Sequence, residues 1–145
     1  MPETNKLRLS WDQFHQDVKT LCQKIKKSGQ YDKIIAISRG GLFPAAIAAY
    51  ELNIRDLEVI NLIGYDGEQK RADPQISGFA GKADKRTLIM DDLSDTGRSI
   101  GLLRQRFPEA VYAVVYAKPQ GLAAPDICAK EIPNSWVIFP WDNDN

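Results

Sequence analysis

The first apolar pattern in the chain has helical spacing. Its positions, three or four residues apart, are Phe14, Val18, Leu21 and Ile25. This spacing places the four side chains on one face of an amphipathic helix. Ser10 and Gln13 match a capping box at the start of the pattern, and Gly29 is a typical stop signal. We therefore expect a helix over residues 10–28.

Short apolar runs alternate with further helical segments along the rest of the chain. The run at residues 33–38 is rich in isoleucine and almost wholly apolar, which is typical of a strand covered on both faces of a parallel sheet. The other predicted strands are residues 57–63, 87–90 and 110–117 and a short apolar strand within SWVIFPWD, and the helices between them are residues 45–52 and 99–107. This alternation predicts an α/β fold, a doubly wound and mainly parallel sheet with helices on both faces.

One long segment lacks both patterns. Residues 64–86 are polar, carry several glycines and show little periodicity. A loop of this length inside a small domain is usually functional and commonly forms a lid over a site. We expect such a lid here.

Composition indicates one domain and excludes some partners. The chain has 145 residues, 43% of them hydrophobic, so we expect residues 1–145 to form a single domain with one core. Its 19 basic and 19 acidic residues balance, which argues against binding to nucleic acid or an anionic membrane. Cys22 and Cys128 are too few for a disulfide framework, and no signal peptide or membrane-spanning run is apparent. We expect a cytoplasmic protein with no integral membrane segment.

Chemically active residues follow three of the predicted strands. They are Arg39, Gly40 and Gly41 after the first strand, Asp91 and Asp92 after the third, and Lys118 after the fourth. In open α/β sheets, ligands bind beyond the carboxyl ends of the strands. Adjacent glycines let backbone amides approach an anion, and an arginine adds a fork-shaped donor that suits phosphate. These strand ends are therefore predicted to form one site.

A second anion site is predicted beside the two aspartates. The sequence DTGRS at residues 95–99 opens a helix, where unpaired N–H groups and the helix dipole favour a phosphate. The hydroxyls of Thr96 and Ser99 add further donors. Carboxylates between two anion sites need a mediator, either a divalent cation such as Mg²⁺ or the hydroxyls of a sugar. A substrate with a phosphate, a diol and a diphosphate would satisfy all these groups.

Other interpretations of these residues fit less well. Taken singly, Asp91 and Asp95 could be turn and N-cap residues, and Arg39 a surface charge. A P-loop needs G-x-x-x-x-G-K-[ST], which does not occur, and a haloacid-dehalogenase phosphatase needs two aspartates at i and i+2. A receiver domain needs more strands than the interval between Asp92 and Lys118 can hold.

The segment LIMDDLSDTGRS resembles the phosphoribosyl-diphosphate signature of the type I phosphoribosyltransferases. The sequences ISRGGLFPAAIAAYELNIR, YDGEQKR, YAKPQG and SWVIFPWD are similar to one branch, the bacterial xanthine-guanine phosphoribosyltransferases. The resemblance implies the type I fold with a small C-terminal hood element. It also implies Mg²⁺-dependent transfer of the 5-phosphoribosyl group from 5-phosphoribosyl 1-diphosphate to N9 of a 6-oxopurine, namely guanine, xanthine or hypoxanthine. A homo-oligomer, dimer or tetramer, is implied as well.

The resemblance assigns roles around the phosphates and the ribose. Arg39, preceded by a cis peptide, would bind the diphosphate with Gly40, and Arg71 would reach it from the lid. Asp91 and Asp92 would bind the ribose diol, with Asp92 also serving the metal. The 5-phosphate would lie in a cradle formed by Asp95, Thr96, Gly97, Arg98 and Ser99, although Arg98 stands where this branch usually has glycine.

It also assigns a purine pocket. Asp95 would manage the N7 proton as the catalytic acid or base, and Lys118 would read O6. Trp136 would stack on the base, and the backbone at Val137 would contact the group at C2. Trp141 is expected to pack in the core. Two alternatives remain open, a non-catalytic sensor of phosphoribosyl diphosphate or guanine nucleotide on the same fold, and, more weakly, a pyrimidine-specific transferase.

Overall fold

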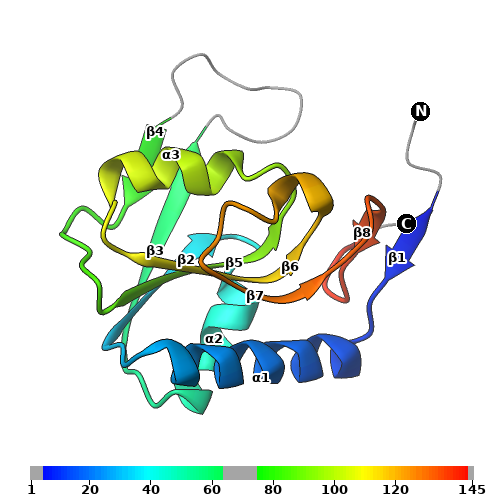
Figure 1. Cartoon of the computed structure of the whole chain (residues 1–145), viewed down its shortest axis with the longest axis horizontal. Helices are drawn as coiled ribbons and strands as arrows, with labels where there is room; N and C mark the ends of the chain where they lie inside the picture. Colours follow the sequence, from blue (N-terminus) through cyan, green and yellow to red (C-terminus); the bar gives the residue numbers. More distant parts are fainter. Residues whose placement is uncertain (1–4, 64–74, 144–145) are drawn as a thin grey trace.

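The computed structural model describes residues 5–63 and 75–143. Within these residues six strands form a central sheet in the order β4-β3-β2-β5-β6-β7 (Figure 1). In chain order they are β2 (Lys33–Ser38), β3 (Asp56–Ile63), β4 (Gln75–Gly78), β5 (Thr87–Ser94), β6 (Val111–Ala117) and β7 (Ile127–Glu131). Neighbouring strands are parallel except β3 and β4. The predicted doubly wound, mainly parallel α/β sheet is confirmed.

Helices cover both faces of this sheet (Figure 1). Helices α1 (Trp11–Ser28) and α2 (Leu42–Glu51) lie on one face, and α3 (Arg98–Arg106) lies on the other. The Ser10 half of the predicted capping box is confirmed, since the Ser10 hydroxyl accepts a bond from the backbone N–H of Gln13 at 3.1 Å, whereas the Gln13 side chain donates to Asp17 Oδ1 at 3.0 Å. Helix α2 begins earlier than expected, at Leu42, because Pro44 is tolerated in a first helical turn, where its missing N–H has no intrahelical partner.

The apolar run of β2 explains the layering. Ile34 and Ala36 pack in the cluster under α1 and α2, whereas Ile35 and Ile37 pack in the cluster under α3. All four residues are buried. Side chains alternate across a strand, so a strand buried on both faces has no polar positions along its middle.

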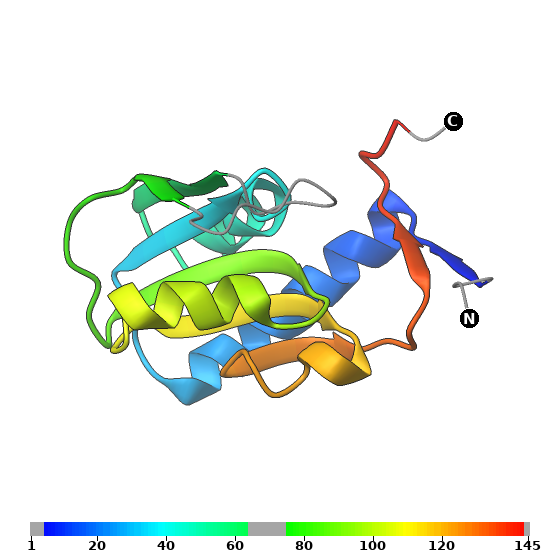
Figure 2. The ribbon, with the colours of Figure 1, turned by 90° about the horizontal axis from the view of Figure 1, so that it is seen from above.

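A second, two-stranded sheet lies beside the carboxyl ends of the main strands (Figure 2). It pairs β1 (Lys6–Arg8) with β8 (Trp136–Ile138) in parallel. Strand β8 was predicted and forms the expected hood element. Strands β1, β4 and β7 were not predicted, because each is short and lies at a sheet edge, with too few buried positions for a clear pattern. A short 3₁₀ turn, Pro119–Gly121, follows β6.

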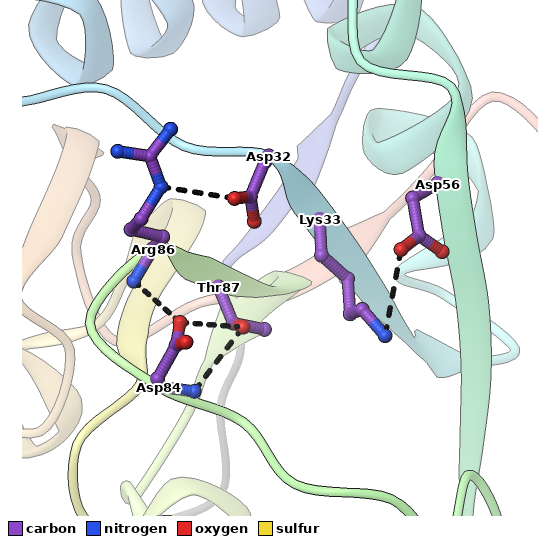
Figure 3. A network of polar contacts seen from close by, with 6 residues as sticks. All are labelled: Asp32, Lys33, Asp56, Asp84, Arg86 and Thr87. Atoms are coloured by element: carbon purple, nitrogen blue, oxygen red, sulfur yellow. Dashed lines mark hydrogen bonds and ion pairs between the residues drawn. The ribbon is translucent and has the colours of Figure 1, made fainter.

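Polar residues at the amino ends of the main strands pair with one another (Figure 3). Arg86 Nε lies 2.9 Å from Asp32 Oδ2, and the backbone N–H of Arg86 donates to Asp84 Oδ1 at 2.8 Å. Lys33 Nζ lies 3.5 Å from Asp56 Oδ2. These charges hold the strand starts together at the edge opposite to the predicted site.

In the part of the chain that the structure describes, no helix combines the length and the apolar character needed to cross a bilayer.

Candidate active site at the carboxyl ends of the strands

The structure brings most of the predicted site residues to one edge of the sheet. Strands β2, β5 and β6 are parallel neighbours, so their carboxyl ends lie side by side. Arg39 follows β2, Asp91 lies near the end of β5, and Lys118 follows β6. The carboxyl edge of a doubly wound sheet is where such folds bind ligands.

The loop after β2 lies directly against the acidic end of β5. The peptide between Ser38 and Arg39 is cis, as the resemblance implied. A Cβ on Gly40 would collide with the Asp92 carboxylate, and one on Gly41 would lie 2.5 Å from the Met90 carbonyl oxygen. Side chains at these two positions would force the loop away from β5. The glycines thus keep the backbone close to the carboxylates.

The acidic pair is part of β5 rather than of the turn after it. We predicted that this strand ends at residue 90, but its pairing with β6 continues through Ser94. Asp91 and Asp92 are half-buried, and Asp91 Oδ1 accepts a bond from the backbone N–H of Asp92 at 2.8 Å. Burial raises the pKa of Asp91 well above its usual range, and the charge of Asp92 adds to this rise. Burial also raises the pKa of Asp92.

The turn that leads into α3 has the geometry of an anion cradle. Gly97 adopts φ +87° immediately before the first helical residue, Arg98. This left-handed conformation favours glycine. The Thr96 hydroxyl accepts a bond from the Arg98 N–H at 3.3 Å, and Ser99 lies half-buried in the first turn. Amides at a helix start attract anions through their unpaired hydrogens and the helix dipole.

Asp95 and Lys118 approach each other beside this cradle. Lys118 Nζ lies 3.5 Å from Asp95 Oδ1. The lysine side chain is 5% exposed, whereas that of Asp95 is 55% exposed. A nearly buried ammonium next to an accessible carboxylate offers one donor and one proton acceptor to the same ligand.

Two polar residues of this site were not predicted from the sequence. Gln120 Nε2 donates to Asp95 Oδ1 at 3.1 Å and lies 3.4 Å from Asn134 Oδ1. Neither residue stands in a recognisable motif, and only the fold of the turn after β6 brings them to Asp95. The position of Gln120, two residues after Lys118, was the one available signal.

The hood element carries the two tryptophans that were assigned different roles. Trp136 in β8 is 60% exposed, and Val137 is half-buried. Trp141 stacks between Phe43 and Phe139, with ring centroids 4.0 Å and 4.6 Å apart. The predicted packing role of Trp141 is confirmed, while the exposed ring of Trp136 remains accessible to a ligand.

Two predictions fall on residues that the structure does not describe. Arg71 and the first part of the predicted lid lie within residues 64–74, outside the described residues. The rest of the predicted loop contains β4, which pairs with β3 in antiparallel orientation. That part was therefore wrongly predicted to lack secondary structure.

The acidic pair suits a metal ion that takes some of its ligands from the protein and the others from the substrate. Among residues 5–63 and 75–143, no group of three or more His, Cys, Asp or Glu side chains could hold a metal ion. Mg²⁺ commonly binds to one or two carboxylates and completes its shell with water and substrate phosphates. Asp92, beside the half-buried Asp91, fits this mode of binding.

Comparison with known proteins agrees with this geometry. Residues 10–144 match the model of the phosphoribosyl transferase domain. The chain belongs to the phosphoribosyltransferase family. Members of this family are glycosyltransferases, and the type I fold of this chain is shared by its structural neighbours.

Curated relatives from two bacteria are xanthine-guanine phosphoribosyltransferases. The chain is 39% identical to that of Nitratidesulfovibrio vulgaris over 137 residues, covering 94% of this chain and 84% of the relative. It is 40% identical to that of Desulfotalea psychrophila over 139 residues, covering 94% and 86%. Among solved structures, the purine phosphoribosyltransferase of Pyrococcus horikoshii superposes with a TM-score of 0.83 at 27% identity, covering 98% of this chain and 97% of the other.

Proposed function

We propose that the protein is a purine-salvage phosphoribosyltransferase. It transfers the 5-phosphoribosyl group from 5-phosphoribosyl 1-diphosphate to N9 of a 6-oxopurine, which is guanine, xanthine or hypoxanthine. The products are the nucleoside monophosphate and diphosphate. The observation that carries this proposal is the nearly buried ammonium of Lys118 at 3.5 Å from Asp95, at the strand edge that also holds Asp91 and Asp92.

Each part of the donor substrate has a partner at this edge. Arg39 and Gly40 bind the diphosphate, and Arg71 adds a second guanidinium. Asp91 and Asp92 accept bonds from the ribose hydroxyls. The 5-phosphate lies on the N–H groups of residues 95–99 and accepts bonds from the hydroxyls of Thr96 and Ser99. Arg98 supports this cradle through its backbone N–H, which donates to the Thr96 hydroxyl at 3.3 Å.

Asp92 would hold Mg²⁺ together with oxygens of the substrate, and the ion would supply positive charge beside the diphosphate. When the anomeric C–O bond breaks, its electron pair leaves with the diphosphate and the sugar gains oxocarbenium character. Arg39 stabilises the departing charge. N9 of the base then bonds to the anomeric carbon, and Asp95 accepts the proton that the base loses at N7.

Lys118 selects the class of base. Its ammonium donates to the carbonyl oxygen at C6 of an oxopurine. The amino group of adenine is itself a donor, so it would face the lysine ammonium donor to donor and make no bond there. Trp136 stacks on the purine, and the backbone at Val137 contacts the substituent at C2.

A panel of bases tests the proposal. Purified protein with Mg²⁺ and phosphoribosyl diphosphate is incubated with guanine, xanthine, hypoxanthine or adenine, and nucleotide is measured. We expect product from an oxopurine but not from adenine, with kcat lowered at least 100-fold by Asp95→Asn, since general acid–base catalysis contributes about 10²–10⁴-fold. Asp56→Asn, at the opposite edge of the sheet, is the matched control. Saturable binding of phosphoribosyl diphosphate without product from any base would contradict the proposed transferase and favour the non-catalytic sensor.

The predicted homo-oligomer, a dimer or tetramer, is also proposed. Tyr50 is 90% exposed, and with Leu57 and Arg55 it lines a hollow of about 280 Å³ between α2 and β3. Val59 is exposed on the same strand. These exposed apolar side chains, with Arg55 beside them, form a patch that a second copy can cover. We expect Tyr50→Asp to lower the mass measured by sedimentation equilibrium.

The proposed compartment is the cytoplasm. Cys22 is buried, Cys128 is half-buried, and both are free thiols, which suits a reducing environment. Burial raises the pKa of the Cys22 thiol to about 11, so it stays protonated and unreactive.

A further inference from the structure

Asp95 has two partners on the same carboxylate oxygen. Lys118 Nζ lies 3.5 Å from Oδ1, and Gln120 Nε2 donates to Oδ1 at 3.1 Å. Neither contact occupies Oδ2. Within residues 5–63 and 75–143, these contacts therefore hold one oxygen and leave Oδ2 as the atom that can accept a proton.

Gln120 is carried by a turn that is fixed to the end of β5. The Ser94 hydroxyl donates to the Gly121 carbonyl oxygen at 2.7 Å, and the Lys118 N–H donates to the Ser94 carbonyl oxygen at 3.1 Å. A Cβ on Gly121 would lie 2.7 Å from the Asp95 carbonyl oxygen, so the two segments are in close contact. The backbone of Gln120 thus has a defined position relative to Asp95.

The same amide group also reaches the hood segment. Gln120 Nε2 lies 3.4 Å from Asn134 Oδ1, and Asn134 precedes Trp136 by two residues. A side-chain amide has two N–H donors, so it can serve both acceptors at once. It links the carboxylate of Asp95 to the segment that carries the exposed tryptophan.

We propose that Gln120 is a positioning residue for Asp95 and for the purine-stacking segment. This inference rests on the proposed function. When Lys118 turns its ammonium to O6 of the base, Asp95 loses that partner. Gln120 then keeps Oδ1 in place, so that Oδ2 faces the purine proton. It does so as a neutral donor, which leaves the carboxylate able to accept the proton.

Gln120→Met tests this role, because methionine has a similar length and no N–H donor. We expect kcat with the preferred oxopurine to fall about 10- to 150-fold, the range for losing a hydrogen bond to a charged group. The KM for phosphoribosyl diphosphate should stay within about twofold, since its 5-phosphate binds the backbone of residues 95–99 and Gln120 contacts only the side chain of Asp95. Gln105→Met, on an exposed position in the last turn of α3, is the matched control.

A second variant separates electrostatic positioning from simple packing. Gln120→Glu keeps the shape but sets a carboxylate against Asp95, so kcat at neutral pH should be lower than for Gln120→Met. Lowering the pH should restore part of the loss, because a protonated carboxyl donates as the amide does. Equal kcat values for the two variants at all pH values would overturn the proposal.

The hood contact is tested by Asn134→Ala. Asn134→Ala and Gln120→Met should each raise the KM for the purine, and the double variant should be no worse than the worse single variant. Multiplying effects, or a Gln120→Met enzyme with wild-type kcat, would overturn the inference while the proposed function stands. A wild-type protein without transferase activity on any oxopurine would overturn both.

Discussion

Several single residues at the carboxyl edge of the sheet favour ligand binding rather than the stability of the fold. Asp91 and Asp92 place two acids side by side on a half-buried strand end, and burial raises the pKa of each. Gly40 lies directly beside the Asp92 carboxylate, and a side chain at this position would collide with it. The acidic pair lowers the stability of the fold, and the fold does not require the glycine. Both features make it easier for a cation and a sugar diol to bind.

Replacing Asp91 by Asn should stabilise the protein without ligand. The raised pKa means that the folded state binds a proton more tightly than the unfolded chain, so stability contributed by this group is lost as pH rises through that pKa. At pH 7.5 we expect Asp91→Asn to raise the free energy of unfolding by on the order of 1 kcal/mol, the usual size of a single-substitution effect. The gain should shrink at pH 5, because lowering the pH increases the protonated fraction of the wild-type carboxyl.

Urea denaturation at both pH values without Mg²⁺ measures this effect, and calorimetric titration with phosphoribosyl diphosphate should show weaker binding. Asp56→Asn, on an exposed carboxylate at the other edge, is the control. A loss of stability at pH 7.5 would contradict the prediction.

Replacing Gly40 by Ala should weaken binding of the donor substrate. The added methyl group would collide with the Asp92 carboxylate and displace either the loop or the acid. We expect a loss of about 1–3 kcal/mol in stability from overpacking and a tenfold or greater rise in the KM for phosphoribosyl diphosphate.

Gly101→Ala is the matched control for this substitution. No heavy atom lies within 4 Å of a Cβ placed on Gly101 in α3, and alanine is the better helix former. This variant should gain about 0.5–1 kcal/mol with unchanged kinetics. Similar kinetic losses in both variants would show that the Gly40 effect is not local.

At the scale of elements, a buried polar contact fixes α1 on β6. Asp17 is 8% exposed, and its Oδ2 accepts a bond from the Tyr116 hydroxyl at 2.6 Å. Gln13 Nε2 donates to the other oxygen at 3.0 Å. Burial, with Asp17 beside it, raises the pKa of Tyr116, so the tyrosine stays a donor. The apolar spacing of α1 predicts the helix but does not indicate its partner on the sheet.

Removing the hydrogen bond from Tyr116 to Asp17 should lower the free energy of unfolding more than removing the bond that Tyr112, on the same strand, makes to Phe107. Tyr116→Phe leaves a buried carboxylate with a missing donor, so we expect a loss of about 1–3 kcal/mol. Tyr112→Phe removes a bond of 2.9 Å to the neutral carbonyl oxygen of Phe107 and should cost about 0.5–1.5 kcal/mol. Thermal unfolding of the two variants gives the comparison, and equal losses would contradict it.

At the scale of the whole molecule, the hood is attached to the main body through an aromatic stack. Trp141 lies between Phe43 of α2 and Phe139, and its edge approaches Phe14 of α1 with centroids 4.9 Å apart. This contact lets β8 present Trp136 to solvent beside the site. One tryptophan therefore holds the hood, and the other remains available.

Truncating Trp141 should mainly lower stability, whereas truncating Trp136 should mainly weaken purine binding. Trp141→Ala should lower the free energy of unfolding by about 3 kcal/mol, the lower end for truncating a packed aromatic residue. Trp136→Ala should change it by less than about 0.5 kcal/mol, yet raise the purine KM roughly tenfold or more, since stacking on a base is worth about 1–3 kcal/mol. Unfolding and steady-state kinetics on both variants test this, and a stable Trp141→Ala protein would refute the assignment.

Local pattern and motif predicted much of this protein. The period of the apolar residues predicted α1 and the strand β2, because periodicity reports directly which faces are buried. The DTGRS motif predicted a helix start with an anion cradle, since the conformation of a turn depends on its own residues. The family resemblance added roles for Asp95 and Lys118, which then proved to lie 3.5 Å apart.

Other features arise only when distant segments meet. Asp91 and Asp92 belong to β5 because β6 pairs alongside them, a contact that no local pattern encodes. The bridge from Gln120 to Asp95 and Asn134 joins residues 25 and 14 positions apart. Short edge strands and polar contacts of this kind depend on which surfaces the packed core brings together, so only the tertiary structure decides them.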